Sequence, residues 1–189
     1  MHALKGFTLI ELMVALAIAM IVLTVGIPGF MATIQNTRIT TTLNDFVSDL
    51  SFARSEAIKR GHRVTLCKSE DAISCTTKGN WAQGWILFAD ANDDGIFNNQ
   101  ETLLRVHQAI SSNSLSLTGN RNVQHYISYV SSGFSRRSSG AVQNGTLILC
   151  DSRGFGKHSR AIVINNTGRL SNIPAPQSSA TNCDFNQHG

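Results

Sequence analysis

Four oxygen-bearing side chains in the middle of the chain have the spacing of a calcium-binding loop. They fit positions 1, 3, 5 and 12 of the pattern D-x-N-x-D-G-x5-E, and they are Asp90, Asn92, Asp94 and Glu101. Asn, Asp and Gly also suit a plain tight turn, because they tolerate positive φ and bond their own backbone. The flanking stretches are predicted strands and not the two helices of an EF-hand. We therefore expect a turn and no cofactor, with calcium as the alternative.

Glu11 is a single carboxylate near the start of an apolar run that covers residues 7–30. This run is long enough to cross a bilayer as a helix and too long for the apolar region of an ordinary secretory signal. Thr8 and Glu11 have the spacing of a capping box, in which the glutamate binds a free backbone N–H. Capping explains the geometry, but it does not explain a charge at membrane depth, which costs about 3 kcal/mol and indicates a functional residue.

The four cysteines are Cys67, Cys75, Cys150 and Cys183. No histidine has the spacing from them that a zinc site needs, so we expect no metal thiolate site. An even number of cysteines in an exported domain, which the N-terminal segment indicates, favours disulfides. Four cysteines allow three pairings. We favour Cys67 with Cys75, and Cys150 with Cys183.

Basic residues outnumber acidic residues in the part of the chain after the apolar run. From Met31 onward there are 15 Lys and Arg against 11 Asp and Glu, and four of these acids lie within residues 90–101. A basic surface can bind phosphate backbones without sequence preference, although clustered charges most often only solvate a surface. The candidate DNA contacts are Arg136, Arg137, Arg153, Lys157, Arg160 and Arg169.

No pattern of residues indicates catalysis. The sequence has no nucleophile elbow, phosphate-binding loop or His-Glu-x-x-His zinc motif. Its six histidines are not spaced to partner a nucleophile or a metal. We therefore expect a non-enzymatic protein with no catalytic residue.

One long helix is predicted to carry the N-terminal residues. After Pro28 the apolar residues recur at steps of three and four, which is typical of an amphipathic helix. They are Ile34, Leu43, Phe46, Val47, Leu50, Ala53, Ala57 and Ile58. Cations at Lys59 and Arg60, followed by Gly61, indicate the helix end. The pattern predicts a helix over residues 7–60 that is loosened at Pro28.

Short apolar or alternating segments follow the helix and predict strands separated by turns. These segments cover residues 63–67, 84–89, 102–107, 114–118, 124–130, 146–150 and 160–165, with 168–171 as one more. Residues 172–182, with two prolines and two serines, are predicted to be a linker. The predicted fold class is α+β, with the long helix packed on an antiparallel sheet.

The stretch Lys5-Gly6-Phe7-Thr8-Leu9-Ile10-Glu11 resembles the processing site of type IV pilins and type II secretion pseudopilins. This resemblance implies that a prepilin peptidase cleaves between Gly6 and Phe7 and methylates the new N-terminal Phe7. Glu11 then faces the terminal amine of a neighbouring subunit, which would compensate its charge. The implied organisation is a leader (1–6), a transmembrane assembly helix (7–30), an amphipathic helix (31–61) and a periplasmic β-rich domain with a disulfide-tethered tail (62–189).

Several later stretches are similar to the GspH/FimT/FimU group of minor pilins and minor pseudopilins. They cover residues 64–67, 81, 84–90, 92–95, 103–105, 147–150 and 166–169. The resemblance implies an inner-membrane protein with a periplasmic domain, which joins other pilins and helps to prime type IV pilus assembly at the tip. The alternatives are a minor pseudopilin of type II secretion and a DNA-binding pilin for natural transformation. Some members bind DNA through Gly-Arg-x-Arg, and Gly168-Arg169-Leu170-Ser171 lacks the second arginine.

Overall fold

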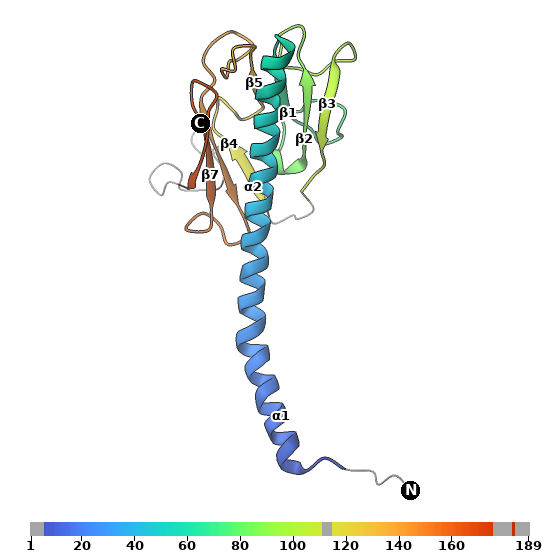
Figure 1. The fold of residues 1–189 in the computed structure, drawn as a ribbon, viewed down its shortest axis with the longest axis vertical. Coiled ribbons are helices and arrows are strands. Elements are labelled where there is room, and N and C mark those ends of the chain that lie inside the picture. The colour runs from blue at the N-terminus through green and yellow to red at the C-terminus, as the bar shows by residue number, and fades with distance from the viewer. Residues whose placement is uncertain (1–5, 111–114, 176–182, 184–189) are drawn as a thin grey trace. The chain divides into compact units, whose positions relative to one another are not determined.

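The computed structural model describes residues 6–110, 115–175 and Cys183. The described chain divides after Arg38 into two compact units, Met1–Arg38 and Ile39–Gly189. The first unit contains the start of the long helix, and the second contains the rest of that helix together with all the strands (Figure 1).

The first unit is helical and exposes its apolar side chains. Helix α1 (Leu9–Ile21) has no buried residue, and its large apolar side chains, such as Leu9 and Met20, are exposed. Within the described residues one helical stretch, Leu9–Arg60, is long and apolar enough to cross a membrane. An apolar surface of this kind is favourable against lipid or against other apolar helices, and unfavourable in water.

The helix departs from α geometry just before Pro28 and not at the proline itself. A π-helical turn, η1 (Val22–Gly26), separates α1 from α2 (Ile27–Arg60). Pro28 has no N–H to donate to the carbonyl of Thr24, and its ring crowds that carbonyl, so the irregularity falls in the preceding turn. The Thr24 hydroxyl donates to the Met20 carbonyl oxygen at 2.8 Å. The predicted loosening is therefore present, but about one turn earlier than expected.

The buried face of α2 begins at Ile39. It continues at steps of three and four through Leu43, Phe46, Leu50, Ala53 and Ala57. The helix ends as predicted, with Gly61 at φ 73° and its N–H donating to the Ala57 carbonyl at 3.1 Å. The apolar period also places Ile58 on the buried face, and this prediction is wrong, because Ile58 is 53% exposed. Its position next to Ala57 turns it about 100° away from the buried face.

The strands form two antiparallel sheets and not one. In the first sheet, the order is β3 (Thr102–His107), β2 (Trp85–Ala89), β1 (Val64–Lys68) and β5 (Tyr126–Tyr129). In the second, the order is β4 (Ser116–Gly119), β6 (Gly145–Cys150), β7 (Arg160–Ile164) and β8 (Leu170–Pro174). Figure 1 shows the sheets beside the C-terminal half of α2. The α+β fold class is confirmed.

Strand β8 corrects part of the predicted linker. Residues 172–174 pair with β7, where Pro174 lies opposite Arg160. Proline cannot donate to a sheet ladder, but β8 is an edge strand, so its position there is tolerated. The remaining linker residues 176–182 lie outside the described residues.

Aromatic side chains join α2 to the sheets. Phe46 makes edge contacts with Trp81 and Trp85, with ring centroids 5.3 and 4.9 Å apart. Trp81 belongs to the short 3-10 helix η2 (Trp81–Gln83). Its indole N–H donates to the Val123 carbonyl at 3.0 Å, and that of Trp85 donates to the Asp49 carboxylate at 2.8 Å. Each buried indole therefore has a partner for its polar atom.

Candidate functional site

The two described residues before Thr8, Gly6 and Phe7, are not held by packing against the rest of the structure. Gly6 and Phe7 precede α1, and Phe7 is 91% exposed. A Cβ atom added at Gly6 would meet nothing within 4 Å. A larger side chain therefore fits at position 6 without disturbing this structure.

Glu11 caps its own helix. One carboxylate oxygen, Oε2, accepts hydrogen bonds from the backbone N–H and the hydroxyl of Thr8, both at 2.9 Å. The Thr8 hydroxyl in turn accepts from the Glu11 backbone N–H at 3.3 Å, which completes the capping box. The predicted capping is confirmed. The other oxygen, Oε1, accepts no hydrogen bond from the part of the chain that the structure describes, and Glu11 is exposed.

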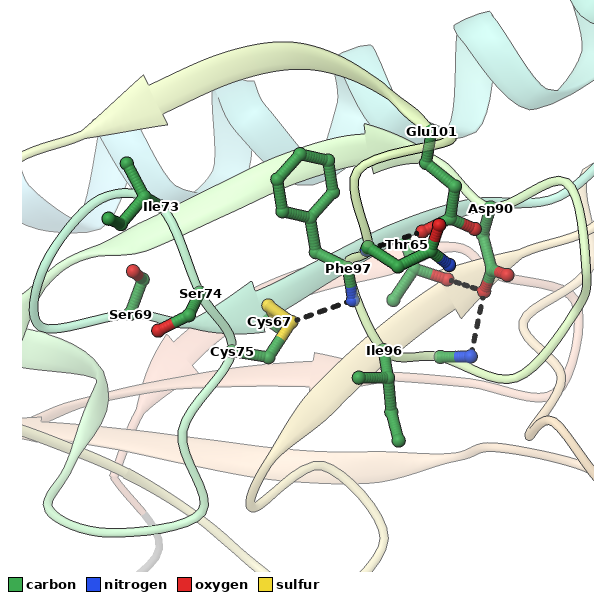
Figure 2. The surroundings of a disulfide bond; sticks show 12 residues. Thr65, Cys67, Ser69, Ile73, Ser74, Cys75, Asp90, Ile96, Phe97 and Glu101 are labelled. Atoms are coloured by element: carbon green, nitrogen blue, oxygen red, sulfur yellow. Dashed lines mark hydrogen bonds between the residues drawn. A yellow bond between two sulfur atoms is a disulfide. The ribbon is translucent and has the colours of Figure 1, made fainter.

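The acidic loop, residues 90–101, connects β2 to β3 and starts from a buried carboxylate. Asp90 is 1% exposed. Its Oδ2 atom accepts from the Thr65 hydroxyl at 2.6 Å and from the Gly95 backbone N–H at 3.0 Å (Figure 2). Its Oδ1 atom is buried and has no hydrogen-bond partner in the described chain. The loop itself therefore uses one oxygen of Asp90 and leaves the other unpaired.

The structure brings three of the four predicted oxygen donors of the acidic loop together. One carboxylate oxygen each from Asp90, Asp94 and Glu101 lies within 4.8 Å of the other two. Asn92 contacts Asp94 through a 2.7 Å hydrogen bond from its amide to the Asp94 carboxylate. Burial raises the pKa of Asp90 above its usual value. Burial, together with the negative charges of Asp90 and Asp94, also raises the pKa of Glu101.

The predicted tight turn is also present in the acidic loop. Asp93 and Gly95 have positive φ angles of 63° and 77°. The Asp93 carboxylate accepts from Nε of Arg63 at 2.7 Å, and the buried guanidinium of Arg63 also donates to the Ser128 hydroxyl. Sequence patterns did not single out Arg63 or Thr65. Their partners lie 25 residues or more away along the chain, as with the 25 residues between Thr65 and Asp90, so no local spacing could reveal them.

Both favoured disulfides are present. Cys67 on β1 is bonded to Cys75, with Cα atoms 5.6 Å apart. Cys150 on β6 is bonded to Cys183, with Cα atoms 6.0 Å apart. The Cys183 carbonyl accepts from the Thr118 hydroxyl on β4 at 2.6 Å, so Cys183 contacts two strands of the second sheet. The first disulfide lies beside the acidic loop, where the backbone N–H of Phe97 donates to Cys75 Sγ at 3.4 Å (Figure 2).

The candidate DNA contacts are distributed over three segments. Arg136 and Arg137 follow β5, Arg153 and Lys157 lie in the loop between β6 and β7, and Arg160 and Arg169 belong to the β7–β8 hairpin. Arg160 starts β7 and Arg169 precedes β8. Because β7 pairs antiparallel with β8, these two residues lie at opposite ends of the hairpin.

Several of these basic residues already have partners: the Arg136 guanidinium lies over the Phe134 ring, and Arg137 hydrogen-bonds Tyr126. Arg153 binds the carboxylate of Asp151 through Nε at 2.9 Å and a terminal nitrogen at 2.6 Å. The Arg160 guanidinium donates to the carbonyl oxygens of Lys157 and Ser159. Lys157 and Arg169 are exposed. The segment Gly168-Arg169 lies in a turn that Asn165 stabilises, since its Oδ1 accepts from the backbone N–H of Arg169 at 2.9 Å.

Two protein families match the sequence. The family described as type II transport protein GspH matches residues 42–168. The prokaryotic N-terminal methylation motif matches residues 1–27. Together the two matches cover the segment of Gly6, Phe7 and Glu11 and most of the second unit. A search of curated proteins gave no significant match.

Solved structures with a similar fold come from two bacterial machines. The type IV minor pilin FimU of Pseudomonas aeruginosa is 16% identical, with a TM-score of 0.57, over 78% of this chain and 96% of that chain. The minor pseudopilin EpsH from the type II secretion system of Vibrio cholerae is 12% identical, with a TM-score of 0.50, over 74% of this chain and 98% of that chain. Both likenesses concern the fold.

Proposed function

Because this chain belongs to the GspH family of type II transport proteins and carries the prokaryotic N-terminal methylation motif, we propose that it is a minor pilin that helps to prime type IV pilus assembly at the tip. The family and the similar structures comprise pilins and pseudopilins, not enzymes. The family match and the shared fold support a minor pilin or pseudopilin, and the priming role at the tip goes beyond this class.

Processing is proposed to occur between Gly6 and Phe7. A prepilin peptidase would remove residues 1–6 and methylate the amine of Phe7. The exposure of Phe7 supports this step, because a peptidase needs an accessible bond. After cleavage the apolar helix would hold the protein in the inner membrane, with the second unit in the periplasm. The two disulfides support that compartment, since disulfides persist in oxidising surroundings.

The state of Glu11 is the observation that carries the assembly proposal. Capping uses only Oε2, and the exposed Glu11 side chain is surrounded in sequence by apolar residues. A carboxylate in such surroundings is costly unless an opposite charge meets it. The methylated amine of a neighbouring subunit would be that charge. Glu11 would thus cap its own helix and set the axial position of the next subunit at the same time.

Two variants, Glu11→Gln and Thr8→Ala, separate capping from charge, and a third, Gly6→Leu, tests processing. Glu11→Gln keeps a side chain that fits a capping box but removes the negative charge. Thr8→Ala removes the capping hydroxyl but keeps the charge. In a strain whose own copy of the gene is deleted, we expect the Glu11→Gln variant to be cleaved yet to restore few pili, and Thr8→Ala to restore pili in nearly normal number. Gly6→Leu should accumulate as a heavier, uncleaved precursor, because it changes the residue before the proposed cleavage site, while the fold itself accepts a side chain there.

The readouts are pili counted by electron microscopy and the subunit mass. Normal piliation with Glu11→Gln would contradict the charge pair. An equal loss with Thr8→Ala would assign the effect to capping alone. Normal cleavage of Gly6→Leu would contradict the proposed processing site.

A minor pseudopilin role is the second candidate, favoured by the GspH family match and the fold shared with EpsH. Deleting the gene distinguishes the two machines. Loss of surface pili with intact protein secretion supports the pilus, and loss of secreted exoproteins with intact pili supports the pseudopilus.

DNA binding has weaker structural support. Arg153 is held by Asp151, and Arg160 and Arg169 lie at opposite ends of a hairpin. Lys157 and Arg169 are exposed and offer accessible charges. A gel shift of the detergent-solubilised protein with duplex DNA at low and high salt tests this role. Binding to phosphates would weaken steeply as salt rises, and no binding at low salt would exclude it.

A further inference from the structure

The buried oxygen of Asp90 is an unusual feature of the acidic loop. A buried carboxylate oxygen without a partner loses its hydration and gains nothing in exchange. Asp90 is 1% exposed, and only its Oδ2 atom accepts hydrogen bonds, from Thr65 on β1 and from Gly95 in the loop. Oδ1 is buried and unpaired within the described chain. The fold thus holds the Asp90 carboxylate in a fixed place and leaves one of its oxygens unpaired.

Two further carboxylates lie close to that of Asp90. Single oxygens of Asp94 and Glu101 lie within 4.8 Å of an oxygen of Asp90 and of each other. Figure 2 shows the Glu101 side chain reaching from the start of β3 toward Asp90. Backbone N–H groups fix the Glu101 carboxylate, with Asn98 donating at 3.0 Å and Ala91 at 3.2 Å. Asp94 is likewise fixed by the Ile96 N–H at 2.6 Å.

No basic side chain neutralises this cluster through an ion pair in the described part of the chain. Arg63 is the cation whose charge affects Asp90. Its guanidinium is bonded instead to the carboxylate of Asp93, the Ser128 hydroxyl and the Arg136 carbonyl. Three carboxylates that share one place repel one another unless a cation joins them.

We propose that the acidic loop binds one calcium ion through Asp90, Asp94 and Glu101. Carboxylate oxygens are ligands for hard cations, whereas zinc prefers nitrogen and sulfur. Calcium accepts six to eight oxygens in flexible geometry, and magnesium requires a near-ideal octahedron and keeps several waters. The side chain of Asn92, backbone carbonyls of the loop and water would complete the shell. The flanking elements are strands, so this would be a calcium loop in a β2–β3 connection and not an EF-hand.

Calcium binding would stiffen the acidic loop and also the ends of β2 and β3 that the loop connects. The backbone of Phe97 is bonded to Cys75 Sγ, and the Phe97 ring packs on Phe88 of β2 with centroids 5.3 Å apart. A cation held between Asp90 and Glu101 would therefore tie the end of β2 to the start of β3 beside the Cys67–Cys75 disulfide. This inference does not depend on which machine the protein assembles into.

Calcium titration of the full-length protein tests the proposal. The protein is purified in detergent, freed of divalent cations and titrated with calcium chloride in a calorimeter, with magnesium chloride as the comparison. We expect one calcium site with a dissociation constant of roughly 10⁻⁴ to 10⁻³ M, as extracellular modules bind it. At about ten times that concentration the melting temperature should rise by roughly 3 to 6 °C. Magnesium should bind more weakly.

Variants of the more accessible ligands keep the test independent of folding. Asp94→Asn and Glu101→Gln should weaken calcium binding about tenfold or more, because each removes a charged ligand. Asp90→Asn is less suitable alone, since its side chain is buried. Asp93→Asn is the matched control, because it removes one charge from the same loop at a position that binds Arg63. It should retain the calcium affinity.

Two results would overturn the proposal. One is the absence of both binding heat and a rise in melting temperature with the unmodified protein. The other is an equal loss of affinity in Asp93→Asn and Asp94→Asn, which would indicate general attraction to an acidic surface and not a coordinated ion.

Discussion

Asp71 organises the loop that the Cys67–Cys75 disulfide closes. Its Oδ1 atom accepts from the backbone N–H groups of Ile73 at 3.0 Å and Ser74 at 2.8 Å, and its Oδ2 atom accepts from the Ser74 hydroxyl at 2.6 Å. Hydrogen bonds from Ser74 and Ile73 hold the pKa of Asp71 well below its usual range, because they favour the charged form. The ionised side chain thus fixes the tip of this loop, in addition to the disulfide that closes it.

The lowered pKa of Asp71 predicts a pH dependence. A carboxylate whose pKa is lower in the folded state stabilises the fold fully above its unfolded pKa, which is about 3.9 for aspartate. That contribution is lost as the pH falls from this value toward the folded pKa. Asp71→Asn should therefore lower the melting temperature near pH 7, and the difference from the unmodified protein should shrink below about pH 4.

Thermal unfolding followed by circular dichroism at several pH values measures this difference. Glu70→Gln, at the exposed neighbouring position, is the control and should have little effect. A difference for Asp71→Asn that stays constant down to about pH 3 would contradict the role given to its ionised form.

Helix α2 has two roles along its length, and the change occurs near Ile39. Before this residue the described side chains are mostly exposed, and after it one face is buried against both sheets. Phe46 lies at the centre of that face, fully buried between Trp81 and Trp85. The helix therefore contributes a large part of the core that positions β2 and the acidic loop after it.

Truncation of Phe46 should be strongly destabilising. Phe46→Ala removes a buried ring and leaves a cavity between two indoles, for which we expect a loss of about 3 to 5 kcal/mol in the free energy of unfolding. Ile58→Ala on the same helix is the control, because Ile58 is 53% exposed. Its effect should stay within about 0.5 kcal/mol. Denaturant unfolding monitored by tryptophan fluorescence compares the two, and similar losses would contradict the assignment of the buried face.

At the scale of the whole molecule, the two units differ in where their apolar side chains lie: the first unit exposes them, and the second buries them in a core. Each residue of the principal core cluster lies at or after Ile39, whereas α1 has no buried residue. The second unit therefore contains its own core and both disulfides. The first unit has an apolar surface that suits lipid and neighbouring pilin helices, and it adds nothing to that core.

This separation predicts that the second unit folds without the first. A fragment starting at Met31, exported to the periplasm so that its disulfides form, should be monomeric in water and should unfold cooperatively. Circular dichroism and thermal unfolding measure the result. Non-cooperative unfolding, or aggregation of the oxidised fragment, would show that the first unit is needed for the fold.

Much of the fold could be predicted because the signals are local. Helix capping by Thr8 and Glu11, the helix end at Gly61 and the eight strand segments depend on residues within a few positions of one another. The pairing of Cys67 with Cys75 is also a short-range contact, separated by 8 residues. Which helix residues are buried was less predictable, because the apolar period does not show where the surface that covers the helix ends. Ile58 is an example, since it continues the apolar period but is exposed.

By itself, the sequence determined the N-terminal methylation motif that contains Gly6, Phe7 and Glu11, the long helix and the strands. Only the tertiary structure decided that the strands form two sheets, that Arg153 is bound to Asp151, and that Asp90 is buried with one unpaired oxygen and with its carboxylate near those of Asp94 and Glu101. The spacing of the acidic loop was compatible both with a turn and with a metal site. Burial and mutual distance are the properties that this spacing could not supply, because both depend on residues such as Thr65 that are distant in sequence and adjacent only in the fold.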